Sequence, residues 1–546
     1  MNEPDLMGKA RQRSMTLIAA AGGVFVFLVF LKIAWVTDDA YIIFRSLEQL
    51  FDGNGPRWNP HNRVQVYTSP LWYWSLAVFR IFSDNVFLNA VIASGVFFVA
   101  TMLLIAKLLS DSLKWLATMG LLVSSIGFFD YTTAGLENAL CYFLITIYLS
   151  LYYQLFATVA AETPAQKATV DGDDRKQRKR LVRGLLLCFG FVLTCRHDMV
   201  TLMLLPTVYA AWSSRHWFRA GELTSAVLIG LSPIIVWSIF SLVYYGALVP
   251  NTAYAKINTG ISRSETWRSG FHYLITCTQV DAITPAVVVG SPLMLITTRT
   301  RHVVALVGGI AISFAYILSV GGDFMVGRFL SFGYLVTVLV LMLYVIDTGT
   351  ASGRQWAAII LAGAVVYMVF YHHTPVNSPL VYSNKAKAPP GAIDERGHYE
   401  EASLVKYCEH RDAPYFPVYP EAKAGYEFSK GKKRYVEMGR LGYFSYWAGL
   451  DKIIVDPYAL TDPLLARLPV DRSARQRIGH FRRKLPDGYR RSILQNDDLI
   501  TNQDLNEFNK RVKIITQSED LFSWERMKTI VAMNLGLYND MIPAEY

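Results

Sequence analysis

Residues 15–40 read MTLIAAAGGVFVFLVFLKIAWVTDDA and decide the fold class. Residues 15–36 form one apolar run, and a bilayer core of about 30 Å needs roughly 20 such residues in a helix. Lys9, Arg11 and Arg13 precede the run. The run is too long for the apolar part of a cleaved signal peptide, and no small-residue cleavage site follows it. The sequence therefore predicts a retained signal anchor.

Further apolar runs continue to residue 372, after which none is long and apolar enough to cross a bilayer. The predicted spans are residues 15–36, 86–106, 115–129, 138–156, 181–195, 199–213, 223–245, 282–298, 303–320, 329–346 and 356–371. Charged residues become frequent after residue 373, although they make up only 18% of the whole chain. This pattern predicts a polytopic α-helical membrane protein with about 11 transmembrane helices in a domain at 1–372, and a soluble α/β domain at 373–546.

Lys and Arg residues gather in the short loops on one side of the predicted spans. They are Lys107, Lys114, Arg175, Lys176, Arg178, Lys179, Arg180, Arg183, Arg215, Arg219, Arg299, Arg301 and Arg354. Such loops face the cytoplasm. Eleven spans then predict a protein of the cytoplasmic (inner) membrane, in contact with membrane lipids, whose C-terminal domain is periplasmic. The same loops account for the net charge of +10, so we expect no nucleic-acid partner.

Five polar clusters fall at the outer ends of these spans. They are Thr37-Asp38-Asp39, Asp130–Thr133 with Glu137-Asn138, Arg196-His197-Asp198, Asn251-Thr252 with Tyr254 and Lys256, and Gly321-Gly322-Asp323 with Arg328. Any one cluster could be an ordinary helix cap. Charged groups at membrane depth are costly when they face lipid, so they usually pair or line a cavity. Five clusters on one side therefore predict the wall of one site.

The adjacent acids Asp38 and Asp39 are the feature that most directly indicates a function. Paired carboxylates suit a general base, a divalent-cation site or an arginine partner. Mutual repulsion raises the pKa of one member of such a pair. The purely structural alternative is that an Asp caps the following helix, because Asp is a favoured capping residue. A divalent cation (Mg²⁺, Mn²⁺ or Ca²⁺) bound by Asp38 and Asp39 is left open, since no soluble-type metal motif occurs.

A set of short motifs in a fixed order resembles a known family. The motifs are TDDAYI (37–42), YTSPLW (67–72), GLEN (135–138), RHD (196–198), PNTAYAK (250–256), GGDFMVGRF (321–329) and DPYALTDPLLARLP (456–469). They resemble the GT-C superfamily of membrane glycosyltransferases, and most closely its terminal arabinofuranosyltransferases. The resemblance implies a polyprenyl-phosphoryl sugar donor, with arabinofuranose as the leading sugar, and a catalytic Asp in the first outer loop.

Roles for the candidate residues follow from this chemistry. Asp38 or Asp39 is the expected base. Four cations suit neutralisation of the departing phosphate: Arg328, His197, Arg196 and Lys256. Six polar residues are expected to bind the sugar or the acceptor: Glu137, Asn138, Asn251, Tyr254, Asp323 and Tyr67. Pairing of Asp323 with Arg328 is the alternative for those two residues.

The acceptor and the class of protein each have a rival reading. The acceptor is expected to be a periplasmic glycan, and a pilin that accepts sugar on a hydroxyl is the runner-up. A lipid flippase or transporter would also carry charged residues among its spans, but it should show two related halves, and no internal repeat is present. Aromatic residues at 443–447 suit either a sugar platform or an ordinary core, and the core is the favoured reading.

Overall fold

The computed structural model describes residues 3–160, 172–257, 259–378, 392–474 and 478–544. Contacts between Cα atoms divide the chain into two compact units. The first unit comprises residues 1–36, 87–234 and 267–405, and the second comprises 37–86, 235–266 and 406–546. The sequence predicts a single boundary after residue 372, whereas this division joins two earlier segments to the C-terminal part of the chain.

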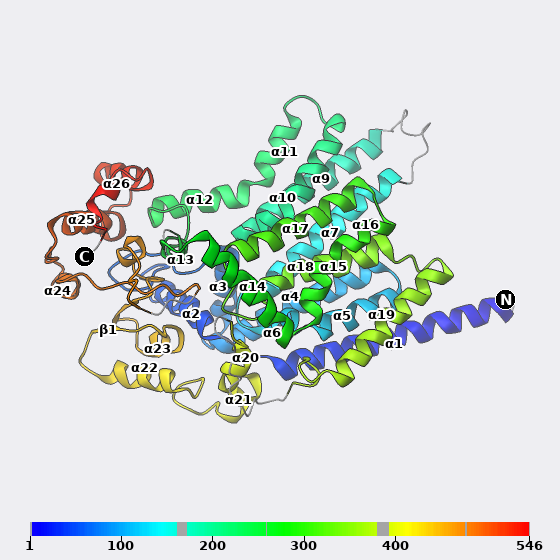
Figure 1. Ribbon diagram of the computed structural model, residues 1–546, viewed down its shortest axis with the longest axis horizontal. Helices are drawn as coiled ribbons and strands as arrows, with labels where there is room; N and C mark the ends of the chain where they lie inside the picture. Colours follow the sequence, from blue (N-terminus) through cyan, green and yellow to red (C-terminus); the bar gives the residue numbers. More distant parts are fainter. Residues whose placement is uncertain (1–2, 161–171, 258, 379–391, 475–477, 545–546) are drawn as a thin grey trace. The chain divides into compact units, whose positions relative to one another are not determined.

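The first unit is helical in its described residues (Figure 1). Its helices are α1 (Glu3–Ile33), α4 (Val86–Leu109), α5 (Ser112–Ser124), α6 (Ile126–Thr133), α7 (Asn138–Ala160), α9 (Gly172–Cys195), η1 (His197–Met199), α10 (Val200–Ser214), η2 (Arg215–Trp217), α11 (Glu222–Gly230), α14 (Arg263–Val280), α15 (Ile283–Gly290), η3 (Ser291–Leu293), α16 (Met294–Thr297), α17 (Arg301–Ser319), α18 (Leu330–Val340), η4 (Leu341–Val345), α19 (Ala351–Phe370), α20 (Glu395–His398) and η5 (Glu400–Ala402). Helix α10 packs along α17, α7 along α9, and α5 along α19.

The predicted spans all fall on helical segments. By length and composition, five described helices can cross a membrane: Met15–Ile33, Val86–Leu109, Asn138–Ala157, Arg301–Ser319 and Ala351–Phe370. Two bent pairs raise that number to at most seven. The other predicted spans correspond to shorter helices or, in α9, to a helix that begins with charged residues. The class of polytopic α-helical membrane protein is therefore confirmed.

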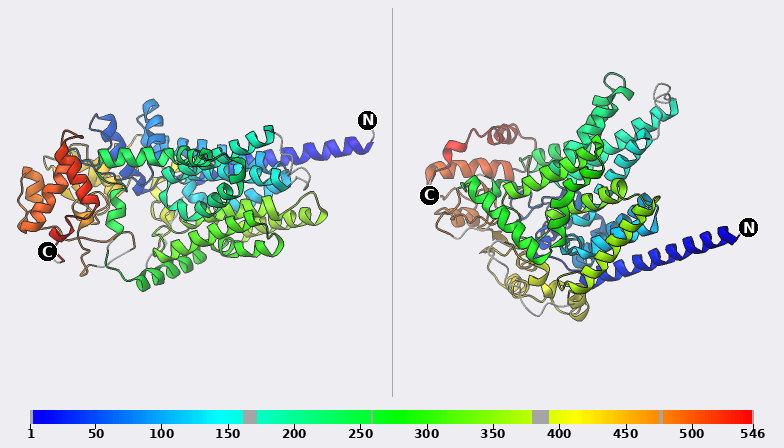
Figure 2. Two further views of the ribbon diagram at one scale, coloured as in Figure 1. Left: turned by 90° about the horizontal axis from the view of Figure 1, so that it is seen from above. Right: turned by 45° about the vertical axis from the view of Figure 1, so that its right-hand side comes forward.

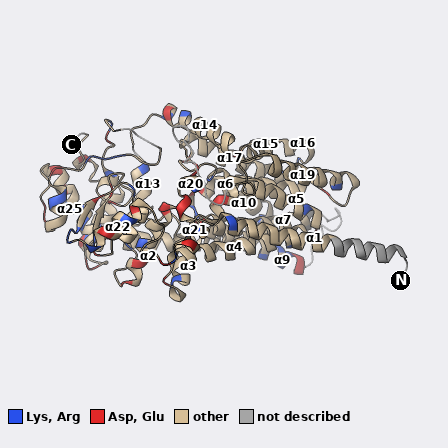
Figure 3. Ribbon diagram, turned by 90° about the horizontal axis from the view of Figure 1, so that it is seen from below, with Lys and Arg blue, Asp and Glu red and all other residues tan. Residues whose placement is uncertain are grey.

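Charge is sparse along the apolar helices, as expected for segments that face lipid or each other. Helix α7 contains no Lys, Arg, Asp or Glu, and Figure 3 shows few charged residues along α4, α7 and α17. Figure 2 shows α1, drawn in dark blue, as one uninterrupted helix. That helix includes residues 15–33 of the apolar run that predicted a membrane anchor.

The second unit combines short helices with one small sheet. Its helices are α2 (Asp38–Phe51), α3 (Pro70–Phe82), α12 (Ser232–Tyr244), α13 (Asn251–Lys256), α21 (Leu404–Glu409), α22 (Pro420–Lys430), α23 (Gly442–Trp447), η6 (Leu465–Arg467), α24 (Tyr489–Gln495), α25 (Gln503–Gln517), α26 (Trp524–Asn534) and η7 (Asn539–Met541). Strands β1 (Tyr435–Glu437) and β2 (Ile453–Val455) pair in parallel, with Tyr435 opposite Ile453. The α/β character predicted for the C-terminal part is thus limited to two short strands among the described residues.

Apolar side chains from several of these helices form the core of the second unit. Leu464, Leu465, Leu505 and Phe508 are almost fully buried in one cluster. The aromatic segment that could have formed a sugar platform lies in α23, and its Phe444 is also buried. The ordinary-core reading of that segment therefore fits the structure.

Candidate active site

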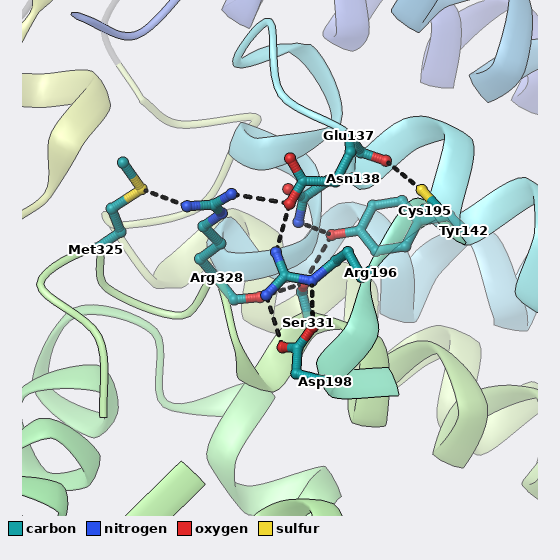
Figure 4. Close-up of polar contacts among 9 residues, drawn as sticks. All are labelled: Glu137, Asn138, Tyr142, Cys195, Arg196, Asp198, Met325, Arg328 and Ser331. Atoms are coloured by element: carbon teal, nitrogen blue, oxygen red, sulfur yellow. Dashed lines mark hydrogen bonds and ion pairs between the residues drawn. The ribbon is translucent and has the colours of Figure 1, made fainter. Parts of the chain in front are cut away.

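Four charged side chains of the first unit form one buried network (Figure 4). One carboxylate oxygen of Glu137 accepts hydrogen bonds from Arg196, at 2.5 Å, and from Arg328, at 2.9 Å. Arg196 also donates to both oxygens of Asp198, at 3.0 and 2.7 Å. Bidentate contacts of this kind fix the orientation of a guanidinium. The network joins three of the five polar clusters predicted from the sequence.

The end of α9 and two aromatic rings position Arg196. Arg196 follows the last residue of α9, and its guanidinium lies 5.3 Å from the ring centre of Phe329 and 4.9 Å from that of Phe332. Guanidinium groups are attracted to such ring faces. Every nitrogen at the head of Arg196 therefore has an acid partner, and the rings hold its position.

A close approach of two glycines brings the Arg328 segment to the network. Gly327 has φ +78°, and a Cβ atom there would lie 2.6 Å from the Cα of Gly127 in α6. Only glycine accommodates both the positive φ and that contact. Helices α5 and α6 form a pair bent by 81°, and Glu137 follows α6 directly before α7 begins. The bend and the glycine contact thus place Glu137 and Arg328 side by side.

Charges in this network balance. Burial alone would raise the pKa of Glu137, but the guanidiniums of Arg328 and Arg196 outweigh it and hold that pKa below its usual range. Glu137 is therefore ionised at neutral pH. Burial lowers the pKa of His197, the next residue after Arg196. His197 is consequently neutral at physiological pH, which weakens its predicted role as a cation for phosphate.

Two further predicted residues of the first unit have buried polar atoms. Asn138 donates from its amide to the hydroxyl of Tyr142, at 3.3 Å, and Tyr142 in turn donates to Ser331, at 2.7 Å (Figure 4). Asp323 accepts from the backbone N–H of Phe324 at 2.8 Å. Within the described part of the chain, the amide oxygen of Asn138 and the second carboxylate oxygen of Asp323 have no hydrogen-bond partner. Both atoms are buried polar groups without a donor contact from the described residues.

Asp38 and Asp39 lie in the first turn of α2, in the second unit. Asp38 is buried, and its two oxygens accept backbone N–H groups of Gly442, at 3.0 Å, and Tyr443, at 2.7 Å. It therefore caps α23 rather than its own helix. Burial raises the pKa of Asp38 to about 7, with a further contribution from Asp39. Asp39 is partly exposed.

A cation site at the acidic pair does not fit these contacts. Both oxygens of Asp38 already face the N–H groups of a helix end, whereas a cation needs carboxylate oxygens directed at it. Among the described residues, no group of three or more His, Cys, Asp or Glu side chains is arranged to hold a metal ion. Asp39 alone would have to supply any carboxylate ligand from this pair.

The remaining predicted residues lie on or beside a pocket of the second unit. Asn251 and Tyr254 line the pocket, and Tyr245, which also lines it, bonds through its hydroxyl to that of Tyr67 at 2.8 Å. Asn251 donates to the backbone carbonyl groups of the 459–462 segment, at distances between 2.9 and 3.2 Å. Lys256 ends α13 and is exposed. The structure thus brings together Tyr67, Asn251 and Tyr254.

Two arginines of this pocket were missed by the sequence reasoning. Arg467 lies within the quoted motif at 456–469, and Arg63 precedes the motif at 67–72. Nothing in the local pattern separates them from ordinary surface cations. Their common pocket depends on contacts between segments far apart in the chain, which no spacing rule reports.

Comparisons with known proteins identify the class of this protein. No family model matches the sequence. The chain is 24% identical over 535 residues to a terminal β-(1→2)-arabinofuranosyltransferase of Mycobacterium tuberculosis, covering 83% of this chain and 81% of that protein. It is 26% identical over 365 residues to the enzyme of the same name from Corynebacterium glutamicum, covering 61% of this chain and about half, 52%, of that protein. This similarity identifies the chain as a glycosyltransferase.

The similarity confirms the resemblance to terminal arabinofuranosyltransferases that the ordered motifs indicated. Among solved structures, the chain is similar to ArnT from Cupriavidus metallidurans, described as bound to undecaprenyl phosphate, with a TM-score of 0.47 and 11% identity over 80% of this chain and 85% of that one.

Proposed function

We propose that this glycosyltransferase transfers D-arabinofuranose from a polyprenyl-phosphate donor to a periplasmic glycan. The observation that carries the proposal is the similarity to two enzymes named terminal β-(1→2)-arabinofuranosyltransferases. The apolar helices support a lipid-linked donor, because a polyprenyl chain partitions into the bilayer in which they lie. The distribution of Lys and Arg among the loops supports a cytoplasmic membrane location with the C-terminal part outside.

The proposed reaction is a substitution at the anomeric carbon of the donor sugar. The acceptor hydroxyl forms a new bond to that carbon, and the bond from the carbon to the phosphate oxygen breaks. The hydroxyl proton passes to a carboxylate, and the polyprenyl phosphate leaves with the electron pair of the broken bond. The protein must therefore supply a base, stabilise a phosphate and hold both reactants in line.

Asp39 is the proposed base. Its neighbour Asp38 has a pKa near the value that suits a general base, but its oxygens are buried against the start of α23. A base must come within hydrogen-bond reach of the proton that it removes. Asp39 is partly exposed, so a substrate hydroxyl can approach it, and Asp38 is proposed to position α2 and α23.

Arg328 is the proposed contact for the donor phosphate. All the head nitrogens of Arg196 point at acids. Arg328 contacts Glu137 of the same network at 2.9 Å, and a guanidinium can form charge-assisted bonds to a phosphate. Arg196 then acts through Glu137 as a positioning residue. For Asn138, Asn251, Tyr254, Asp323 and Tyr67 we propose contacts to sugar hydroxyls.

Paired substitutions at residues 38 and 39 test the assignment of the base. We expect Asp39→Asn to lower kcat by about 10²–10⁴-fold, the usual contribution of a general base, while the melting temperature stays near that of the wild type. Asp38→Asn should lower the melting temperature and leave measurable turnover in the protein that remains folded. Turnover is followed as release of polyprenyl phosphate from a short-chain polyprenyl-phosphoryl arabinose. Wild-type kcat in Asp39→Asn would reject the assignment.

A further inference from the structure

Two arginines line the pocket of the second unit, and neither forms an ion pair with a carboxylate of the described residues. Its cavity volume is about 20 Å³, and Arg63, Arg467, Asn251 and Tyr254 are among its lining residues. Sites for whole small ligands usually measure roughly 300–1,000 Å³. A pocket so far below that range has room for one small chemical group, not for a whole ligand.

Arg63 directs only part of its guanidinium at the protein. Its side chain donates to the carbonyl oxygen of Ser518, and the residue is only 6% exposed. Its buried Nε has no hydrogen-bond partner in the described residues. Burial lowers the pKa of Arg63, and the neighbouring cation Arg57 lowers it further. The surroundings of Arg63 therefore add positive charge instead of compensating it.

Arg467 also lines the pocket, and its guanidinium too contacts a backbone carbonyl oxygen. It donates to the carbonyl oxygen of Pro463 at 2.6 Å, and its guanidinium lies 4.6 Å from the ring centre of Tyr254. Neither Arg467 nor Arg63 forms an ion pair with a carboxylate in the part of the chain that the structure describes. Burial lowers the pKa of Arg467, and Tyr254 and the carboxylate of Asp462 offset only part of that effect.

Asp462, whose charge acts on Arg467, is shared with other groups. It accepts the backbone N–H groups of Leu464, at 3.0 Å, and Leu465, at 2.8 Å, together with the hydroxyl of Tyr489. Among the described residues that line the pocket, none is a carboxylate. Burying a cation whose charge is only partly compensated is costly, so two such arginines on one pocket favour an anion from outside the protein.

We propose that this pocket binds an oxoanion, a phosphate or carboxylate group, between Arg63 and Arg467. Guanidinium forks match the oxygen geometry of both groups. Tyr254 and Asn251 would then contact the part of the ligand next to the anion. The inference shares Asn251 and Tyr254 with the proposed function, but it is tested by binding alone, without any measurement of sugar transfer.

Binding measurements on the purified full-length protein in detergent test the pocket. Three probes are titrated at constant ionic strength: inorganic phosphate, farnesyl phosphate and glucuronate. The variants are Arg63→Gln and Arg467→Gln, and Arg491→Gln, an exposed arginine of α24, is the matched control. Each pocket variant should raise the dissociation constant at least ~10-fold. A hydrogen bond to a charged group is worth about 1.5–3 kcal/mol, and a loss of about 1.4 kcal/mol in binding free energy raises the dissociation constant tenfold.

The tightest probe identifies the source of the anion. Preference for farnesyl phosphate indicates a lipid headgroup, preference for inorganic phosphate a free ion, and preference for glucuronate an acidic sugar. Two results would overturn the proposal: no saturable binding of any probe to the wild type, or equal binding by wild type and both pocket variants. If Arg467→Gln does not fold, Arg63→Gln alone decides between these outcomes.

Discussion

Asp38 and Asp39 are adjacent in the chain, yet their surroundings differ. Asp38 is buried and accepts two backbone N–H groups of α23, whereas Asp39 is partly exposed. A carboxylate that caps a helix is held in place by the N–H groups of that helix. Its removal therefore lowers the stability of the fold more directly than it lowers the rate of the reaction. The pair therefore combines one positioning carboxylate with one carboxylate that is accessible to a substrate.

Replacement of Arg328 tests the proposed phosphate contact. We expect Arg328→Ala to raise KM for the polyprenyl-phosphoryl donor about tenfold or more, because a charge-assisted bond is lost. Glu137 keeps Arg196 as a partner, so the variant should still fold. Arg354→Ala, at an exposed residue of α19, serves as the control and should leave KM unchanged. An Arg328→Ala enzyme with wild-type kcat and KM would show that the phosphate is held elsewhere.

Individual residues were predictable from sequence only where their type was unusual for their place. Charged groups at the ends of apolar runs indicated Glu137, Arg196 and Arg328, and the structure joins these three in one network. The partner of Arg328 could not be chosen from sequence, because Glu137 lies far from it in the chain. For the same reason the capping of α23 by Asp38 could not be predicted.

Helix α2 carries the acidic pair, and Arg45 in its middle fixes it to the C-terminal part of the second unit. The fully buried guanidinium donates to the carbonyl oxygens of Ser445, at 2.6 Å, Gly449, at 2.8 Å, and Lys452, at 2.8 Å, and also to that of Trp58, at 3.2 Å. A single arginine thus satisfies four buried acceptors. The orientation of the acidic pair depends on this anchor.

Removing that anchor should destabilise the second unit. Arg45→Gln leaves several buried carbonyl groups without donors, and we expect a loss of about 3 kcal/mol, since each unsatisfied group costs roughly 1–3 kcal/mol. The measurement is the thermal unfolding of the purified protein. Arg440→Gln, which removes an exposed ion pair with Glu421, is the matched control and should change little. Equal melting temperatures for Arg45→Gln and the wild type would contradict the anchoring role.

The membrane segments of the whole molecule were predictable because apolar run length is a local property of the chain. The predicted spans coincide with helices, although only five helices, or at most seven segments, are long and apolar enough by themselves. Shorter helices such as α15 and α18 pack along each other. The inclusion of residues 37–86 and 235–266 in the second unit depends on long-range contacts and was not predicted.

Cysteine labelling tests the proposed orientation of the whole chain without any engineered site. Of the five cysteines, Cys408 is exposed and the other four are buried. A membrane-impermeant maleimide should label the wild type in cells whose outer barrier has been opened and whose cytoplasmic membrane is intact. The Cys408→Ser variant should not be labelled. Labelling that requires disruption of the cytoplasmic membrane would place the C-terminal part inside the cell and contradict the proposed topology.

The activity proposed for this membrane protein is the transfer of a sugar from a lipid phosphate to a hydroxyl. The most direct measurement incubates the purified enzyme with a short-chain polyprenyl-phosphoryl arabinofuranose and an arabinan acceptor, and quantifies both products. We predict equal amounts of released polyprenyl phosphate and extended glycan, with both formed about 10²–10⁴-fold more slowly by Asp39→Asn. Intact donor after prolonged incubation of the folded wild type with this pair of substrates would contradict the account.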